Sequence, residues 1–149
     1  MSYHKGQFED LIKRTLAADN LPRKQSAIDL LLGTAAQESS FGTYLRQVGG
    51  PALGVFQMEP ATFTSTREWG REKFPSLRIW NQYPAITPDM LEFDLKIAIV
   101  FARLNYLSKP DSIPESLQGQ AAYWKRYWNT YLGKGTIEQY VKNWNRYVV

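Results

Sequence analysis

The regular spacing of apolar residues constrains the fold of this chain more than any other feature of its sequence. Ile28, Leu31, Leu32 and Ala35 follow the i, i+3, i+4, i+7 pattern of an amphipathic helix. Helical spacing returns near both ends of the chain, where residues 7–18 and 137–148 each carry an apolar face. The pattern therefore predicts a mainly α fold.

Residues that start and stop helices divide the chain into about six of them, over residues 7–18, 23–39, 60–73, 87–107, 114–128 and 136–148. Pro60 suits a first helical turn, and Thr87-Pro88-Asp89 combines a hydroxyl cap, a proline and an acid near the positive helix end. Thr136 is expected to cap the last helix. Residues 74–85, which contain two prolines, are expected to be irregular.

A glycine-rich loop follows the second predicted helix, and its turns are marked by Gly42, Gly49, Gly50 and Gly54. Residues 53–58 within it are expected to form a very short extended piece. Loops held on a rigid scaffold carry functional sites disproportionately often. We therefore expect a cleft where this loop meets the end of the second helix, with the loop as one wall.

Length and composition indicate one folded domain over residues 1–149. A chain of 149 residues with 44% hydrophobic residues is long enough to bury a core. Mean hydropathy is −0.41, and no run of about eighteen apolar residues exists, so we expect no membrane insertion. Residues 1–6 lack the apolar region of a secretory signal, so we expect synthesis in the cytoplasm without a signal peptide.

The residue inventory excludes several kinds of site. The chain has no cysteine, which excludes disulfides and thiolate sites. Its single histidine, His4, argues against a Ser-His-Asp triad or a histidine metal site. We expect no metal and no cofactor. The net charge of +4 comes from scattered basic residues, so nucleic acid is not an expected partner. Chemistry is left to carboxylates, amides, hydroxyls and aromatic rings.

Glu38 is the candidate catalytic residue. It lies seven residues after Leu31 and three after Ala35, so a helix that reaches residue 38 places it on the apolar stripe. Burial against apolar neighbours disfavours the ionised carboxyl and raises its pKa, which suits a general acid. The alternative is a solvated acid near a helix end.

Three short motifs occur in order along the chain. The first is Glu38-Ser39 and the second is Gly54-Val55-Phe56-Gln57-Met58-Glu59-Pro60-Ala61-Thr62. A partial third is Tyr127-Trp128-Asn129-Thr130. On these motifs the chain resembles the soluble lytic transglycosylase family of the lysozyme-like superfamily, and residues 123–136 look more like the variants encoded by bacteriophages.

The chain departs from the family pattern at several positions, which puts substrate details in doubt. Pro51 stands where the family often has glycine, and Glu59 replaces a usual methionine. Trp128 replaces the tyrosine of the third motif, whose glycine is missing.

The resemblance implies a single lysozyme-like domain that cleaves bacterial peptidoglycan. In the family, one glutamate first protonates the glycosidic oxygen between N-acetylmuramic acid and N-acetylglucosamine. It then accepts the proton of the muramyl 6-hydroxyl, which attacks the anomeric carbon and leaves a 1,6-anhydromuramyl end. By resemblance, Glu38 has this role, and other virion or injection-machine proteins are further partners.

The resemblance also assigns substrate-binding roles, each with a structural alternative. Ser39 would orient the catalytic carboxyl, or would satisfy a local carbonyl. Gln57 would hydrogen-bond an N-acetyl group, or would tie down the loop. Gly54 would let the backbone approach the glycan, or would be a turn glycine.

The remaining assigned residues are Glu59 and the third motif. Tyr127, Trp128 and Asn129 would line the far wall of the cleft, with core packing as the alternative for one of the two aromatics. Glu59 would complement the dipole of the following helix, or would act as a second carboxylate and favour attack by water.

Two other functions remain open at this stage. A hydrolytic muramidase would cut the same bond with water, and a non-catalytic wall-binding or structural virion protein would keep the fold without the reaction. Delivery in a virion and release by a holin are both compatible with the expected lack of a signal peptide.

Overall fold

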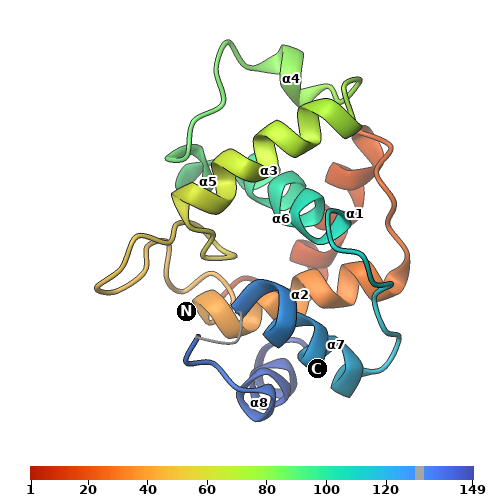
Figure 1. Ribbon diagram of the computed structural model, residues 1–149. Coiled ribbons are helices and arrows are strands. Elements are labelled where there is room, and N and C mark those ends of the chain that lie inside the picture. The colour runs from red at the N-terminus through yellow and green to blue at the C-terminus, as the bar shows by residue number, and fades with distance from the viewer. Residues whose placement is uncertain (130–132) are drawn as a thin grey trace.

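The protein is mainly α, as the apolar spacing predicts. The computed structural model describes residues 1–129 and 133–149. Its first helices are α1 (Lys5–Ala18), α2 (Gln25–Ser39) and α3 (Pro60–Lys73), followed by the short α4 (Ile79–Gln82) and α5 (Met90–Phe93). The chain continues through α6 (Leu95–Leu107), α7 (Leu117–Trp124), the π-helical segment η1 (Lys125–Asn129) and α8 (Ile137–Tyr147). Figure 1 shows their arrangement.

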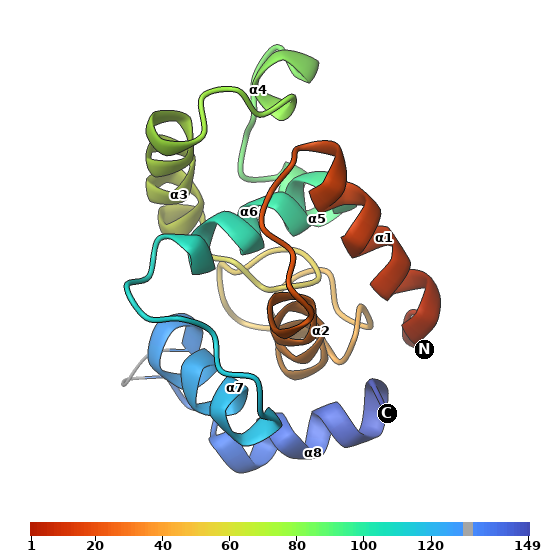
Figure 2. The ribbon, with the colours of Figure 1, turned by 90° about the vertical axis from the view of Figure 1, so that its right-hand side faces the viewer.

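Helix α2 lies at the centre of the packing. It contacts α1, α6, α7 and α8, and Figure 2, which looks nearly along its axis, shows it between α6 on one side and α7 and α8 on the other. Every side chain from Leu30 to Ala36 is buried. The helix is therefore apolar almost all round, as expected of an element in the middle of a core.

Contact between α2 and α8 depends on Gly33. A Cβ atom at this position would lie 1.9 Å from the hydroxyl oxygen of Tyr140, which is fully buried on α8. Only glycine leaves room for the tyrosine ring here. The close approach holds the end of α2, and with it Glu38, against the C-terminal helices.

Local hydrogen bonds define where several helices begin. Thr136 and Gln139 form a reciprocal capping box at the start of α8. Ser116 accepts a hydrogen bond from the backbone N–H of Gly119 at the start of α7. The capping role predicted for Thr136 is confirmed.

The prediction of one continuous helix over residues 87–107 is wrong. Asp94 adopts an extended conformation (φ −120°, ψ 102°) that separates α5 from α6, and its carboxylate accepts a hydrogen bond from the N–H of Ile97. Its other oxygen accepts a hydrogen bond from the Tyr83 hydroxyl at 2.6 Å. Thr87 does not cap a helix, since its hydroxyl donates to Asp89 instead. Local capping of α6 by Asp94 and a hydrogen bond from Tyr83, eleven residues earlier, therefore fix the break.

The predicted helix over 114–128 and the irregular stretch over 74–85 also need correction. The former begins at Leu117 and changes to the wider π-helical form at Lys125. The latter contains the four residues of α4.

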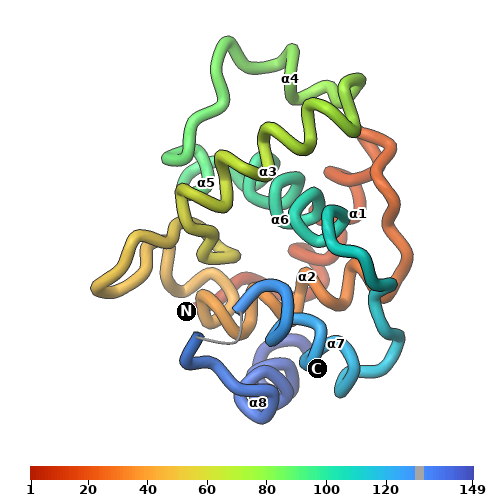
Figure 3. Tube along the Cα trace, viewed as in Figure 1, coloured from red at the N-terminus to blue at the C-terminus, as the bar shows by residue number. Residues whose placement is uncertain are grey.

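The glycine-rich loop between α2 and α3 runs out from the body of the molecule and returns to it, as Figure 3 shows. Leu53 forms isolated antiparallel bridges with both Arg46 and Met58. The prediction of an extended piece over residues 53–58 is wrong, because residues 54–57 form a turn in which Gly54 and Gln57 have positive φ values. Ser40 and Phe41 have positive φ values of 50° and 57°, so the chain leaves α2 sharply just after Glu38. The loop thereby starts beside the candidate acid.

Candidate active site

Residues from six parts of the chain line one cleft of about 940 Å³. They come from the end of α2, the glycine-rich loop, the start of α3, the end of α6 with Lys109 beyond it, η1 with residues 133–135, and α8. Six of the eight predicted site residues lie on the cleft: Glu38, Gln57, Glu59, Tyr127, Trp128 and Asn129. The prediction that the loop forms one wall is confirmed. Thr130, the last residue of the third motif, lies outside the described residues.

Glu38 lies in the last turn of α2, partly buried at the cleft. One carboxylate oxygen, Oε2, accepts a hydrogen bond of 2.9 Å from Nε1 of Trp124. Trp124 is itself fully buried and packs on the ring of Tyr140 at 5.4 Å between centroids.

Burial raises the pKa of Glu38 to about 7, while the hydrogen bond from Trp124, which favours the charged form, lowers it by a smaller amount. At neutral pH this carboxyl is therefore divided between its protonated and ionised forms. A group in this state is able to give a proton to one atom and take a proton from another.

Ser39 points away from the cleft. It is fully buried, its hydroxyl donates to the carbonyl oxygen of Ala35 at 3.0 Å, and it accepts from the N–H of Gly42 at 2.8 Å. These bonds hold the turn after α2. Of the two roles considered for Ser39, the geometry matches the satisfaction of local backbone groups.

Gly54 is a turn glycine and does not line the cleft. Its φ is +83°, and a Cβ atom there would lie 2.0 Å from the carbonyl oxygen of Leu91. The close approach is thus to the chain at α5, and any larger residue would displace the loop.

Gln57 lines the cleft, and its side chain also holds the loop to which it belongs. Its backbone has φ of 51°, and its side-chain Nε2 donates to the carbonyl oxygen of Gly54 at 2.8 Å. The side chain is 8% exposed. Among the described residues its Oε1 has no hydrogen-bond partner, so this residue both ties down the loop and offers an acceptor to the cleft.

Glu59 lies at the N-cap position of α3 and is exposed. Its side chain makes no capping hydrogen bond, although its backbone carbonyl accepts from the N–H of Phe63 at 2.9 Å. The carboxylate lies near the positive end of the α3 dipole and also lines the cleft. Both roles considered for Glu59 fit this position.

Tyr127 and Trp128 are half-buried, so each combines packing with a surface on the cleft. Trp128 packs on Tyr106 at 5.1 Å and on Phe56 at 6.5 Å between ring centroids. The Tyr127 hydroxyl donates to Asp111. Aromatic rings fixed in this way offer rigid faces to a ligand.

Asn129 is oriented by Lys125, a residue that sequence reasoning overlooked. The Lys125 ammonium donates to Oδ1 of Asn129 at 2.6 Å and to the carbonyl oxygens of Gly133 and Gly135 at 2.9 and 2.7 Å. One cation thus joins η1 to the segment before α8. Both parts line the cleft.

The cleft holds other residues that the sequence pattern did not single out, among them Asn105 and Lys109. Trp124 was also missed as the partner of Glu38, because 86 residues separate the two in the chain. Lys109 lies beyond the end of α6, so no helical spacing connects it to Asn105, and only the folded chain brings both to the cleft.

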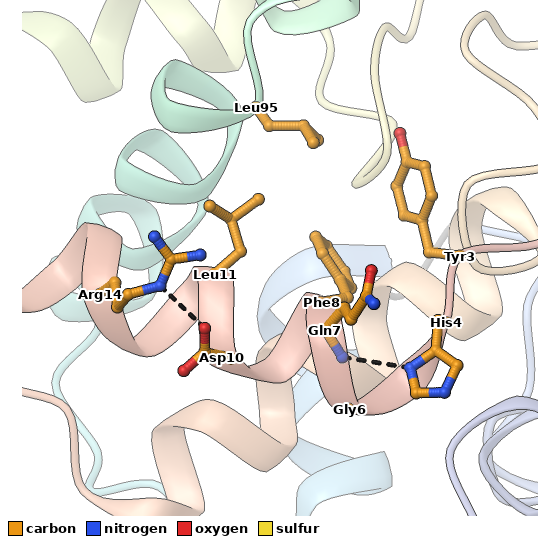
Figure 4. Close-up of a pocket in the computed structure, with 9 residues that line it drawn as sticks. All are labelled: Tyr3, His4, Gly6, Gln7, Phe8, Asp10, Leu11, Arg14 and Leu95. Carbon is orange, nitrogen blue, oxygen red and sulfur yellow. Dashed lines mark hydrogen bonds and ion pairs between the residues drawn. The ribbon is translucent and has the colours of Figure 1, made fainter.

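A second cavity of about 550 Å³ shares no lining residue with the cleft. Figure 4 shows Tyr3, Phe8, Leu11 and Leu95 around it. Its charged side chains are paired, since Arg14 donates to Asp10 at 2.8 Å. His4 also lines it, and its Nδ1 accepts a hydrogen bond of 3.3 Å from the backbone N–H of Gln7.

No described helix has the length and apolar character needed to cross a membrane. Nowhere in residues 1–129 and 133–149 do three His, Cys, Asp or Glu side chains group in a way that could hold a metal ion. Comparison of the chain with protein-family models, with curated proteins and with solved structures found no match.

Proposed function

We propose that this protein cleaves the glycan strands of bacterial peptidoglycan as a lytic transglycosylase, with Glu38 as acid and then base. One observation carries the proposal: a carboxyl with a pKa of about 7 lies in a cleft, held by a single hydrogen bond from Trp124. The order of the motifs and the placement of Gln57 and Asn129 on the same cleft support it.

The reaction uses the two states of Glu38 in turn. Protonated Glu38 donates to the glycosidic oxygen while the bond between that oxygen and the muramyl anomeric carbon breaks, and N-acetylglucosamine leaves with a free hydroxyl. The muramyl 6-hydroxyl then bonds to the anomeric carbon, and its proton passes to the Glu38 carboxylate. The acid is restored without water being consumed.

The other cleft residues hold the strand for this exchange. Gln57 offers Oε1 as an acceptor for an N-acetyl N–H group. Tyr127 and Trp128 present aromatic faces to the apolar faces of sugar rings, and Asn129 adds an amide fixed by Lys125.

Digestion of purified peptidoglycan by the wild-type protein and by Glu38→Gln tests the proposal. We expect the substitution to lower the release of soluble fragments by at least about 100-fold, because a glutamine amide is not acidic enough to protonate the glycosidic oxygen. Glu68→Gln is the matched control, since Glu68 is exposed on α3 and does not line the cleft. Equal release by wild type and Glu38→Gln would overturn the role of Glu38.

A second candidate is a hydrolytic muramidase, and Glu59 is the observation that favours it. This second carboxylate on the same cleft is not used in a capping hydrogen bond, so it is available to activate water. If hydrolysis is the reaction, Glu59→Gln will abolish cleavage as Glu38→Gln does. A transglycosylase will keep most of its activity. Binding of peptidoglycan without cleavage by the wild-type protein would instead favour a wall-binding or structural role.

A further inference from the structure

Two polar side chains reach the cleft near the C-terminal end of α6. Asn105 lies in the last turn of α6 and Lys109 two residues beyond its end, and both line the cleft that contains Glu38. Asn105 is only 6% exposed, and Lys109 is partly buried. Neither belongs to the residues that the acid–base reaction uses.

Neither side chain forms a hydrogen bond or an ion pair with another described residue. Backbone N–H groups already satisfy the helix end, since Ser108 donates to the carbonyls of Leu104 and Asn105 and Lys109 donates to the carbonyl of Tyr106. In the part of the chain that the structure describes, the Asn105 amide and the Lys109 ammonium have no hydrogen-bond partner. No buried side-chain nitrogen or oxygen is unsatisfied there. The Asn105 amide is therefore reached from the cleft.

The Lys109 ammonium is also without a carboxylate partner among the described residues. Neither Glu38 nor Glu59, the acids on the same cleft, forms an ion pair with it. Burial lowers the pKa of Lys109, which shows that the ammonium has lost part of its hydration. A partly desolvated cation gains more from an approaching anion than a fully hydrated one, such as the exposed Lys134 on the same cleft.

We infer that Lys109, with Asn105 on the same cleft, binds a carboxylate of the substrate, so that the cleft selects glycan strands with anionic substituents over neutral strands. The inference rests on the proposed function. In peptidoglycan the muramyl lactyl group ends in a carboxylate when it carries no peptide, and attached peptides supply carboxylates when present. Chitin, which has the same linkage and N-acetyl groups, has none.

Calorimetric titration of the Glu38→Gln protein tests this inference without cleavage of the ligands. Three tetrasaccharides serve as probes: chitotetraose, the muramyl-containing tetrasaccharide without peptides, and the same tetrasaccharide with its peptides. We expect at least one muramyl ligand to bind about tenfold more tightly than chitotetraose. The ligand that shows the preference identifies the source of the carboxylate.

Lys109→Met, introduced into the Glu38→Gln protein, should remove this preference and leave the affinity for chitotetraose unchanged. Lys109→Arg should preserve it, because the positive charge remains. Lys142→Met is the matched control: it removes one exposed lysine that does not line the cleft, so the preference should persist.

A preference that survives Lys109→Met, or no preference in the Glu38→Gln protein, would overturn the inference while leaving the proposed cleavage untouched. Failure of all three tetrasaccharides to bind would overturn both the inference and the proposed function.

Discussion

At the scale of single residues, Glu38 combines two opposing effects. Its position in the last turn of α2 disfavours the charged carboxylate, whereas the indole N–H of Trp124 favours it. Burial is the larger effect, so the pKa rises to about 7 from a usual value of 4.5. The same effect that makes Glu38 a suitable acid must destabilise the fold when Glu38 ionises.

The first prediction concerns stability and pH. Because the pKa of Glu38 is higher in the folded state, the folded protein binds more protons than the unfolded chain between pH 4.5 and about 7. Stability therefore falls as pH rises through that window, by up to about 3 kcal/mol from this group. We expect Glu38→Gln to stabilise the protein, and more at pH 8 than at pH 5.

Urea unfolding of wild type and variant at the two pH values checks this expectation. Glu68→Gln, on the exposed face of α3, should show no such pH-dependent gain. A Glu38→Gln protein that is less stable than wild type at pH 8 would contradict the raised pKa.

The second prediction concerns the hydrogen bond from Trp124. Trp124→Phe removes the donor that stabilises the charged carboxyl, so the pKa of Glu38 should rise further. In the proposed reaction cleavage begins with protonated Glu38, so kcat/KM should fall as pH rises through this pKa, and the alkaline limb should move to higher pH in the variant. The pH profile of peptidoglycan cleavage measures the shift.

Trp80→Phe is the matched control, because Trp80 also uses its indole N–H, in a 2.8 Å bond to the carbonyl of Phe74 away from the cleft. Its profile should keep the wild-type limb. A Trp124→Phe protein with a reduced rate but an unchanged alkaline limb in its pH profile would show that Trp124 contributes packing and does not affect the pKa of Glu38.

At the scale of elements, the site depends on how closely α8 packs on α2. Gly33 allows the Tyr140 ring to lie against the α2 backbone, and Tyr140 in turn supports Trp124, the partner of Glu38. A structural contact on one side of α2 is thus connected to the candidate acid at its end.

The third prediction follows from this contact. Gly33→Ala places a methyl group where the Tyr140 hydroxyl lies, so we expect a loss of about 1–3 kcal/mol in the free energy of unfolding. Guanidinium unfolding measures the loss. Gly6→Ala, in α1, is the control, because its Cβ would meet only ordinary contact at 3.4 Å from His4. Equal stability of the two variants would show that α8 accommodates the methyl group by moving.

At the scale of the whole molecule, the sequence predicts the helices better than it predicts the contacts between them. Predicted helices over 7–18, 23–39 and 60–73 correspond to α1, α2 and α3 with at most two residues of difference at either end. Their apolar periodicity and end signals are local. The break at Asp94 was missed because the apolar spacing continues across it, although Asp94 is a residue type that caps helices and here caps α6. Its hydrogen bond from Tyr83 cannot be read from the sequence.

The same limit applies to the candidate site. The motifs identify six residues that line the cleft: Glu38, Gln57, Glu59, Tyr127, Trp128 and Asn129. The bond from Ser39 to Ala35, four residues earlier on α2, is the local alternative that the sequence already offered, whereas only the three-dimensional packing reveals the approach of Gly54 to Leu91. Trp124 and Lys125 lie within residues 123–136, but the motifs gave them no role. Trp124 acts through Glu38, 86 residues away, and Lys125 acts through its hydrogen bonds to Asn129, Gly133 and Gly135.

In the proposed reaction, Glu38 alone serves as acid and base for an intramolecular attack by the muramyl hydroxyl. Mass spectrometry of the new muramyl ends made in isotopically labelled water distinguishes this reaction from hydrolysis. We expect 1,6-anhydromuramyl ends that carry no label, formed by wild type and not by Glu38→Gln. Reducing ends that carry labelled oxygen would show instead that water attacks the anomeric carbon.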